Sequence, residues 1–161
     1  MLTVRYQKTI SYDLDVVYGQ YYDYEHIAVV HPNTLGEYRL VSTHANDAVY
    51  EQIWPRGRFS KKRGRSVVRH SLLGPYEMEF VFTEGRHKGV RVHTKLSATD
   101  GGTLIDEAYS MPGPNWSWLA KLIRPFVMRS VDRVWEEDLD VEVCHGGWPG
   151  IPPYGNDQEK S

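Results

Sequence analysis

The stretch YEMEFVFTEGRHKGVRVHTKLSATDGGTLIDEAYSM, residues 76–111, alternates with a period of two along most of its length. Apolar residues at 76, 78, 80 and 82 flank glutamates at 77 and 79, and valines at 90 and 92 flank a charged residue. Such alternation is typical of β-strands that bury one face. Gly85 and the glycines at 101 and 102 favour tight turns. The stretch therefore predicts three consecutive strands, over 76–83, 90–99 and 103–111.

The same short period extends toward the N-terminus. Residues 35–44, 48–54 and 65–73 each predict a strand, and residues 2–10 are interpreted as a first strand. Short connections rich in turn-forming residues separate most of these segments. Successive strands joined in this way predict an antiparallel meander.

Helical spacing replaces the alternation on either side of the six consecutive strands. It predicts a helix over about 13–23, followed by a second short helix that ends before Pro32. After the last strand it predicts a helical segment near 115–123 and a long helix over about 125–144. We expect Pro125 to kink or restart the helix between these two segments, because proline disrupts helical hydrogen bonding.

This element order predicts an α+β domain over residues 1–147, in which a curved antiparallel sheet of about seven strands wraps around a long C-terminal helix. One sheet and one long helix can bury their apolar faces by packing against each other. The order resembles the helix-grip fold of the START/Bet v 1-like (SRPBCC) superfamily, over roughly residues 1–145. A cavity between sheet and helix is then expected. Residues 148–161 are predicted to form an extended C-terminal tail.

The composition excludes several classes of protein. The 161 residues include 19 Lys and Arg, 21 Asp and Glu and a single cysteine. The near-neutral charge argues against general nucleic-acid binding, and no apolar run is long enough for a membrane span or a signal peptide. One cysteine excludes an intrachain disulfide. We therefore expect a cytoplasmic protein that binds neither nucleic acid nor membranes.

A histidine motif follows the first predicted helix. Residues 23–36, DYEHIAVVHPNTLG, contain the pattern D-x2-H-x4-H. This pattern resembles the iron-ligand motif of the catalytic domain of Rieske-type non-haem iron oxygenases, of the vanillate and phthalate type. That domain is itself a helix grip. The resemblance implies that His26, His31 and Asp138, the last from a Glu-Asp pair in the long helix, bind Fe(II). It also makes Asp23 the catalytic carboxylate beside the metal.

The chemistry of these residue types agrees with the resemblance. Two imidazoles and one carboxylate leave metal positions open for oxygen and substrate, as in the facial triad that suits Fe(II). Asp23 lies three residues before His26 and could fix its tautomer. Asp138 belongs to an apolar stripe of the long helix, where an unpaired carboxylate is costly. The same residues also fit buried structural histidines and a hydrated Asp138, and this alternative remains open.

The chain departs from the oxygenase pattern in one respect. A Rieske cluster needs two cysteines and two histidines, so no such cluster is expected in this chain. Three consequences are possible: a separate electron-transfer protein as partner, iron chemistry without an external reductant, or a cavity that serves binding only.

Several residues on the predicted strands are candidates for lining a ligand cavity, because large amphipathic side chains often line such sites. The sequence does not determine which face of each strand is concave. His93, like His70, is either a cavity acid or base or a structural residue. The candidate ligand-binding residues are Tyr50, Trp54, Tyr76, Met78, Phe80 and His93.

The leading hypothesis is a stand-alone mononuclear non-haem iron protein, an oxygenase-like enzyme that acts on an aromatic or apolar small molecule. The alternative is a metal-free protein of the same fold. It would bind a hydrophobic ligand such as a lipid or polyketide, or act as a cyclase or dehydratase with His70, His93 or the Asp23/His26 pair as acid and base.

Overall fold

The computed structural model describes residues 1–21, 30–31, 34–54, 64–113 and 117–145, with the side chains of the last helix described from residue 118 to residue 137. These residues form seven strands and two helices. The elements are β1 (Leu2–Ile10), α1 (Leu14–Gln20), β2 (Glu37–His44), β3 (Asp47–Ile53), β4 (Arg65–Gly74), β5 (Glu77–Gly85), β6 (Arg91–Thr99), β7 (Gly102–Met111) and α3 (Ser117–His145).

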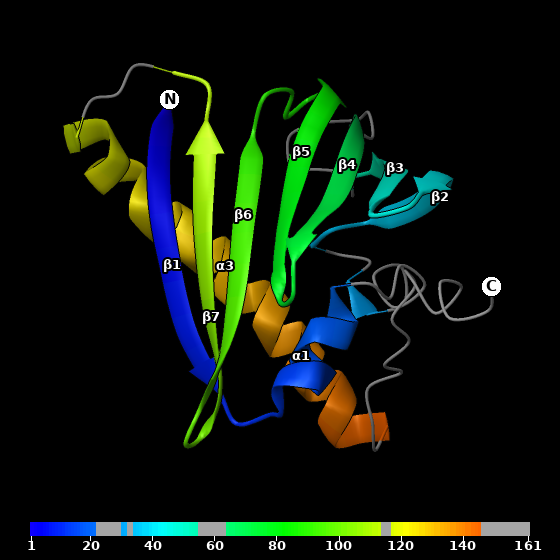
Figure 1. The fold of residues 1–161 in the computed structure, drawn as a ribbon. Coiled ribbons are helices and arrows are strands. Elements are labelled where there is room, and N and C mark those ends of the chain that lie inside the picture. Colours follow the sequence, from blue (N-terminus) through cyan, green and yellow to red (C-terminus); the bar gives the residue numbers. More distant parts are fainter. Residues whose placement is uncertain (22–29, 32–33, 55–63, 114–116, 146–161) are drawn as a thin grey trace.

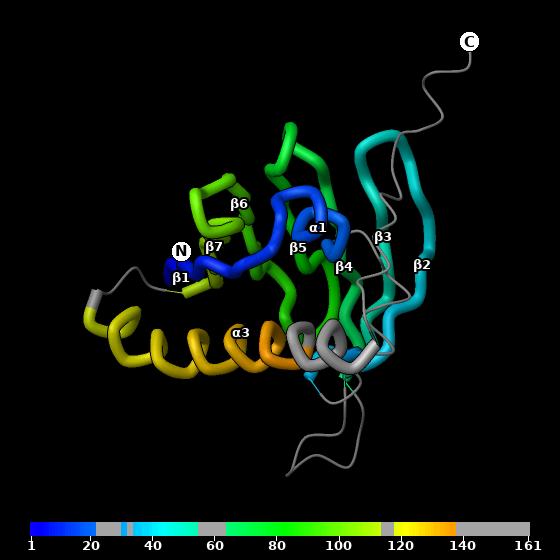
Figure 2. Tube along the Cα trace, turned by 90° about the horizontal axis from the view of Figure 1, so that it is seen from below, coloured from blue at the N-terminus to red at the C-terminus, as the bar shows by residue number. Residues whose placement is uncertain are grey.

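The seven strands form one antiparallel sheet in the order β1-β7-β6-β5-β4-β3-β2 (Figure 1). The first strand, β1, pairs with the last, β7. As a result β1 and β2, which are consecutive strands in the sequence, form the two opposite edges of the sheet. Helix α3 lies along one side of the curved sheet, with α1 near its C-terminal half (Figures 1 and 2). The predicted α+β helix-grip architecture is confirmed.

The main core lies where the β1–β7–β6 part of the sheet meets the two helices. Tyr6 and Ile105 are fully buried on adjacent strands, and Val17 packs against them from α1. Val131 and Trp135 complete this core from α3. Alternate residues of the strands face this core because successive side chains of a strand point to opposite sides.

The predicted strand ends agree with the observed ones to within two residues, but the prediction for the last helix is wrong in one respect. Helix α3 continues through Pro125 instead of breaking there. Proline removes one backbone hydrogen bond and crowds the carbonyl four residues earlier. That carbonyl belongs to Lys121, which is exposed together with Leu122 and Phe126. Water can therefore satisfy the carbonyl, and the helix tolerates the proline.

Helix α1 is also shorter than predicted, because it ends at Gln20 rather than near residue 23. Most of the second short helix falls on residues 22–29, outside the described residues. The predicted tail, 148–161, lies outside them too.

Candidate functional site

A cavity of about 330 Å³ lies between the concave face of the sheet and α3. Phe80 and Phe82 line it from β5, and Val131 and Val134 line it from α3. Helix α1 and the segment before β2 supply the remaining sides. The volume is at the lower end of the range of small-molecule sites, roughly 300–1,000 Å³.

Aromatic rings form much of the cavity wall. Eight of its twenty lining residues are Tyr, Trp or Phe. The rings of Tyr38 and Tyr50 lie 4.9 Å apart, and the Trp54 ring stacks on Phe82 at 6.3 Å. Burial raises the pKa of both the Tyr38 and the Tyr50 hydroxyl, so both stay neutral at physiological pH. This wall suits the flat face of an apolar ligand.

A buried carboxyl group on β7 lines the same cavity. Glu107 is 5 % exposed, and its Oε1 accepts hydrogen bonds from the Tyr21 hydroxyl at 2.9 Å and the Thr94 hydroxyl at 3.4 Å. Its Oε2 accepts one from the Tyr109 hydroxyl at 2.5 Å. We call these four residues the Glu107 cluster. Burial raises the pKa of Glu107 above its usual range, although the hydrogen bonds oppose this effect.

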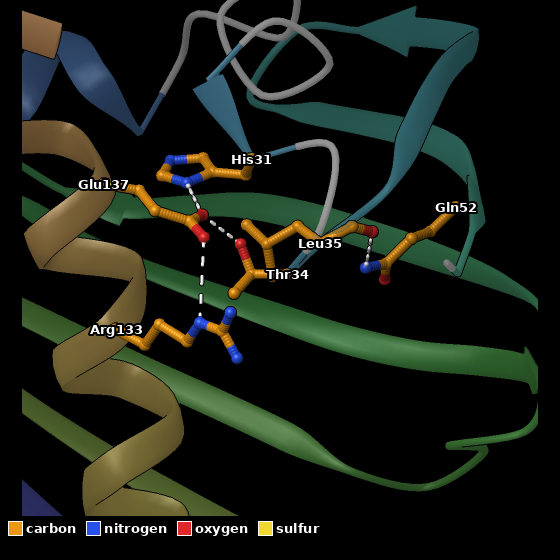
Figure 3. Close-up of polar contacts among 6 residues, drawn as sticks. All are labelled: His31, Thr34, Leu35, Gln52, Arg133 and Glu137. Carbon is orange, nitrogen blue, oxygen red and sulfur yellow. Dashed lines mark hydrogen bonds and ion pairs between the residues drawn. The ribbon is translucent and has the colours of Figure 1, made fainter. Parts of the chain in front are cut away.

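A second polar cluster joins α3 to the segment before β2 (Figure 3). Oε2 of Glu137 lies 3.0 Å from Nδ1 of His31 and accepts a hydrogen bond from the Thr34 hydroxyl. Nε of Arg133 lies 3.9 Å from the other carboxylate oxygen. We call these four residues the Glu137 cluster. His31 and Thr34 line the cavity.

Local hydrogen bonds hold the cavity side of the Glu137 cluster in place. The His31 carbonyl accepts hydrogen bonds from the amides of Leu35 and Gly36, both at 2.9 Å. The Gln52 side chain on β3 donates to the Leu35 carbonyl at 2.9 Å. Gly36 has φ of 81°, a conformation that favours glycine. A tight turn thus places His31 against α3.

The predicted iron ligands are only partly described. His31 is 2 % exposed, and its Nδ1 lies 3.0 Å from Oε2 of Glu137. Asp23 and His26 lie outside the described residues, as does the side chain of Asp138. Within the described ranges, no three His, Cys, Asp or Glu side chains are close enough together to hold a metal ion. The Fe(II) site stays a prediction.

The predicted ligand-binding residues occupy different places. Tyr50, Trp54 and Phe80 line the cavity. Met78, two residues before Phe80 on β5, is fully buried in the main core. The Tyr76 hydroxyl donates to Asp15 on α1 at 2.8 Å.

Neither candidate histidine on the strands lines the cavity. His93 lies on the outer face of β6, where its Nε2 is 2.8 Å from Glu77. His70 is fully buried and stacks on Phe80 at 4.2 Å. Burial lowers the pKa of His70 to about 3, so its ring is neutral at physiological pH.

Sequence reasoning missed the Glu107 cluster. One signal was present: positions 103, 105 and 107 are the inward positions of an alternating strand, and the third of them is a glutamate. A charged residue at such a position is unusual, because buried carboxylates are costly. Its hydroxyl partners Tyr21 and Thr94 lie far from it in the sequence, and no local sequence pattern predicts that they contact Glu107.

Comparisons with known proteins identify the fold. No family model matches the chain, and no curated protein is similar in sequence. A START superfamily protein from Mycobacterium smegmatis has a similar structure, with a TM-score of 0.66 at 9 % identity over 86 % of this chain and 97 % of that one.

Two further similar structures are enzymes by name. The Zhui aromatase/cyclase from Streptomyces sp. R1128 has a TM-score of 0.57 at 11 % identity, over 92 % of this chain and 98 % of that one. The di-domain ARO/CYC StfQ of the steffimycin biosynthetic pathway has a TM-score of 0.62 at 13 % identity, over 87 % of this chain and 48 % of that one. None of the three is named as an iron protein.

No helix among the described residues is long and apolar enough to cross a membrane. At these low identities the similarities establish fold and not function. The chain has the helix-grip fold of START-like and Bet v 1-like proteins.

Proposed function

We propose that the protein binds a small, largely apolar and aromatic molecule in the cavity between the sheet and α3. The observation that carries this proposal is the aromatic wall, eight rings around a space of about 330 Å³. Burial of apolar ligand surface against such a wall provides the affinity. The volume favours a ligand of one or two rings over a long-chain lipid or a large polyketide.

The structural neighbours support a role for the cavity. Two of the three reported above are named as aromatase/cyclases, and they share the arrangement of sheet and long helix. This support is an analogy between folds, so the cavity residues of this chain have to carry the proposal.

The test compares a filled cavity with an unchanged one. Val92 lines the cavity from β6, so Val92→Phe should fill part of it. Val41 is exposed on β2, and Val41→Phe is the matched control. Calorimetric titration with a panel of one-ring and two-ring aromatic compounds should show one site per chain. We expect Val92→Phe to weaken binding by at least about tenfold, the effect of roughly 1.4 kcal/mol of steric conflict.

The control variant should bind as the wild type does. Absence of saturable binding by any compound would overturn the proposal. Equal affinities of wild type and Val92→Phe would also contradict it, because the ligand would then occupy another place.

A second candidate function is proton transfer to the bound molecule, as a cyclase or dehydratase requires. Glu107 favours it, because it is a carboxyl group in the cavity lining whose pKa is raised by burial, and such groups are candidates for acid or base catalysis. Solvent-deuterium exchange at the α-carbon of an aryl ketone, followed by NMR, tests this function. Wild type should accelerate the exchange, whereas Glu107→Gln should not. Asp106→Asn, one residue away on the outer face of β7, should behave as wild type.

The iron hypothesis is a separate proposal with its own test. His26, His31 and Asp138 would hold Fe(II), which supplies oxygen activation when bound. Protein purified anaerobically without chelator should contain about one iron per chain, and Asp138→Ala should contain none. Equal iron content in the two proteins, or no iron in either after reconstitution, would contradict it.

A further inference from the structure

We infer that the natural ligand of the cavity carries a positively charged amine, which binds the carboxylate of Glu107 among the surrounding aromatic rings. The inference rests on the proposed function, since it assumes that the cavity binds a small aromatic molecule. It adds the chemical class of the polar group that this molecule must carry.

The charge of the cavity wall is the first argument. Among the described lining residues, Glu107 is the one acidic side chain, and none is Lys or Arg. The lining also contains two histidines: His31 faces Glu137, and burial lowers the pKa of His87. Among the described residues, the ionisable groups near Glu107 are Tyr21 directly after α1, Tyr109 and Asp106 on β7, and Tyr6 on β1. None of these groups can supply a positive charge. A buried carboxylate without a cation is costly, and a ligand ammonium would supply the missing charge.

The hydrogen bonds around Glu107 are the second argument. Its three partners among the described residues are all hydroxyl groups that donate to it, which suits the ionised carboxylate. Oε1 accepts two of these bonds and Oε2 accepts one. An ionised carboxylate offers about four acceptor positions, so one remains for an N–H group of the ligand.

A neighbouring side chain offers a further acceptor. Gln20 precedes Tyr21 at the end of α1 and lines the cavity. Its buried Oε1 and Nε2 both have no hydrogen-bond partner among the described residues, and an ammonium can satisfy the first of them. Buried polar atoms are rarely left in this state. A primary ammonium has three N–H donors, enough for Glu107 and Gln20 together.

The aromatic rings near Glu107 are the third argument. The Tyr21 ring lies 6.0 Å from Trp135 and 6.2 Å from Phe80, and both of these rings line the cavity. Aromatic faces attract cations and repel anions. A carboxylate or phosphate ligand would meet Glu107 and these faces without any Lys or Arg from the described lining residues to compensate.

Three molecules that differ in charge but little in size test the inference. These are 2-phenylethylamine, 2-phenylethanol and phenylacetate, titrated calorimetrically into wild type, Glu107→Gln and Glu79→Gln at pH 7.5. Glu79 lies on the outer face of β5, where it pairs with Arg91 at 3.6 Å, so its variant is the matched control. Thermal unfolding of each variant shows that it is folded.

We expect wild type to bind the amine at least about tenfold more tightly than the alcohol, and the acid most weakly. Glu107→Gln should bind amine and alcohol equally to within about threefold, whereas Glu79→Gln should keep the preference of wild type. Equal binding of amine and alcohol by wild type would overturn the inference and leave the proposed function standing. An amine preference that survives in Glu107→Gln would overturn it as well. Failure of all three molecules to bind would contradict the proposed function itself.

Discussion

Two glutamates, one in the lining of the cavity and one beside the lining residues His31 and Thr34, differ in the groups that surround their carboxylates. Glu137, on α3, faces His31 and lies within 4 Å of Arg133, and its side chain is 23 % exposed. Glu107, on β7, is surrounded by the hydroxyls of Tyr21, Thr94 and Tyr109 and is nearly inaccessible. The first carboxylate has basic partners within the protein, and the second has none among the described residues.

This difference suggests different roles for the two clusters. The Glu137 cluster is complete within the protein and joins the segment before β2 to the last helix, which is a structural task. The Glu107 cluster places a carboxyl group in the cavity with no basic partner among the described residues, and such incomplete arrangements are typical of ligand sites. Substitutions in the two clusters that change the free energy of unfolding in opposite directions would support this difference in roles.

The largest effect is expected from a core side chain that contacts the Glu107 cluster. Trp135 is buried on α3, two residues before Glu137, and its ring contacts Tyr21 of the Glu107 cluster. Trp135→Ala should lower the free energy of unfolding by about 3–5 kcal/mol, because it opens a large cavity. Urea denaturation measures this loss. Trp118→Ala, at an exposed position of the same helix, should cost less than about 1 kcal/mol. Similar losses in both would contradict the packing role.

The next effect is a loss of folding stability at acidic pH. It depends on His70, whose ring stacks on the cavity residue Phe80. The pKa of His70 falls from 6.5 to about 3 on folding, because burial disfavours the charged ring. The unfolded chain therefore takes up the proton first, and stability is lost as pH falls from about 6.5 toward 3. The expected loss is up to about 1.4 kcal/mol per pH unit.

His70→Phe keeps the stack on Phe80 and should flatten this part of the pH profile of unfolding. His44→Phe, at an exposed position of β2, is the control and should leave the slope unchanged. An unchanged slope in His70→Phe would show that another group causes the acid sensitivity.

A smaller effect on the free energy of unfolding should follow from neutralising Glu137, the carboxylate with basic partners. Glu137→Gln weakens the contacts with His31, Thr34 and Arg133 and should cost roughly 1–2 kcal/mol. Hydrogen exchange at the amides of Leu35 and Gly36 should become faster, because their acceptor is the His31 carbonyl.

The neighbouring Glu136→Gln serves as the control, because Glu136 is exposed on the same helix. Exchange rates that do not differ between the two variants would remove the proposed link between α3 and the segment before β2.

The smallest effect on the free energy of unfolding, with the opposite sign, is expected from neutralising Glu107. Glu107→Gln should leave the free energy of unfolding at pH 7 unchanged or raise it by up to about 1 kcal/mol. The pKa of Glu107 is raised above 4.5 in the folded protein, so wild type loses stability as pH rises through 4.5 toward the raised value. The difference between the variant and wild type should therefore grow from pH 4 to pH 7. Destabilisation of the variant at pH 7 would place Glu107 with Glu137 as a structural residue.

Local patterns in the sequence were enough to predict most of the secondary structure and the fold class. The alternation over residues 76–111 and the helical spacing after it are local properties, and each strand or helix follows them with small errors at its ends. The prediction that Pro125 breaks the last helix failed, because the solvent exposure of a helix turn decides how costly a missing hydrogen bond is. That exposure depends on how the helix packs.

The candidate site was only partly predictable, for the same reason. Phe80 and Met78 share one face of β5, and only the register of the sheet places the first in the cavity and the second in the main core. The carboxylate beside His31 lies 106 residues away in sequence, and the packing of α3 brings Glu137 to that place.

The Glu107 cluster depends on tertiary structure most of all. Its hydroxyl groups come from the residue after α1 and from β6 and β7, and the helix packing and strand register bring them onto one carboxylate. Periodicity in a sequence reports which side of a strand or helix is apolar, because this is a property of neighbouring residues. Periodicity does not show which buried side chains meet across a cavity, because that depends on the curvature of the sheet and on where the helix packs against it.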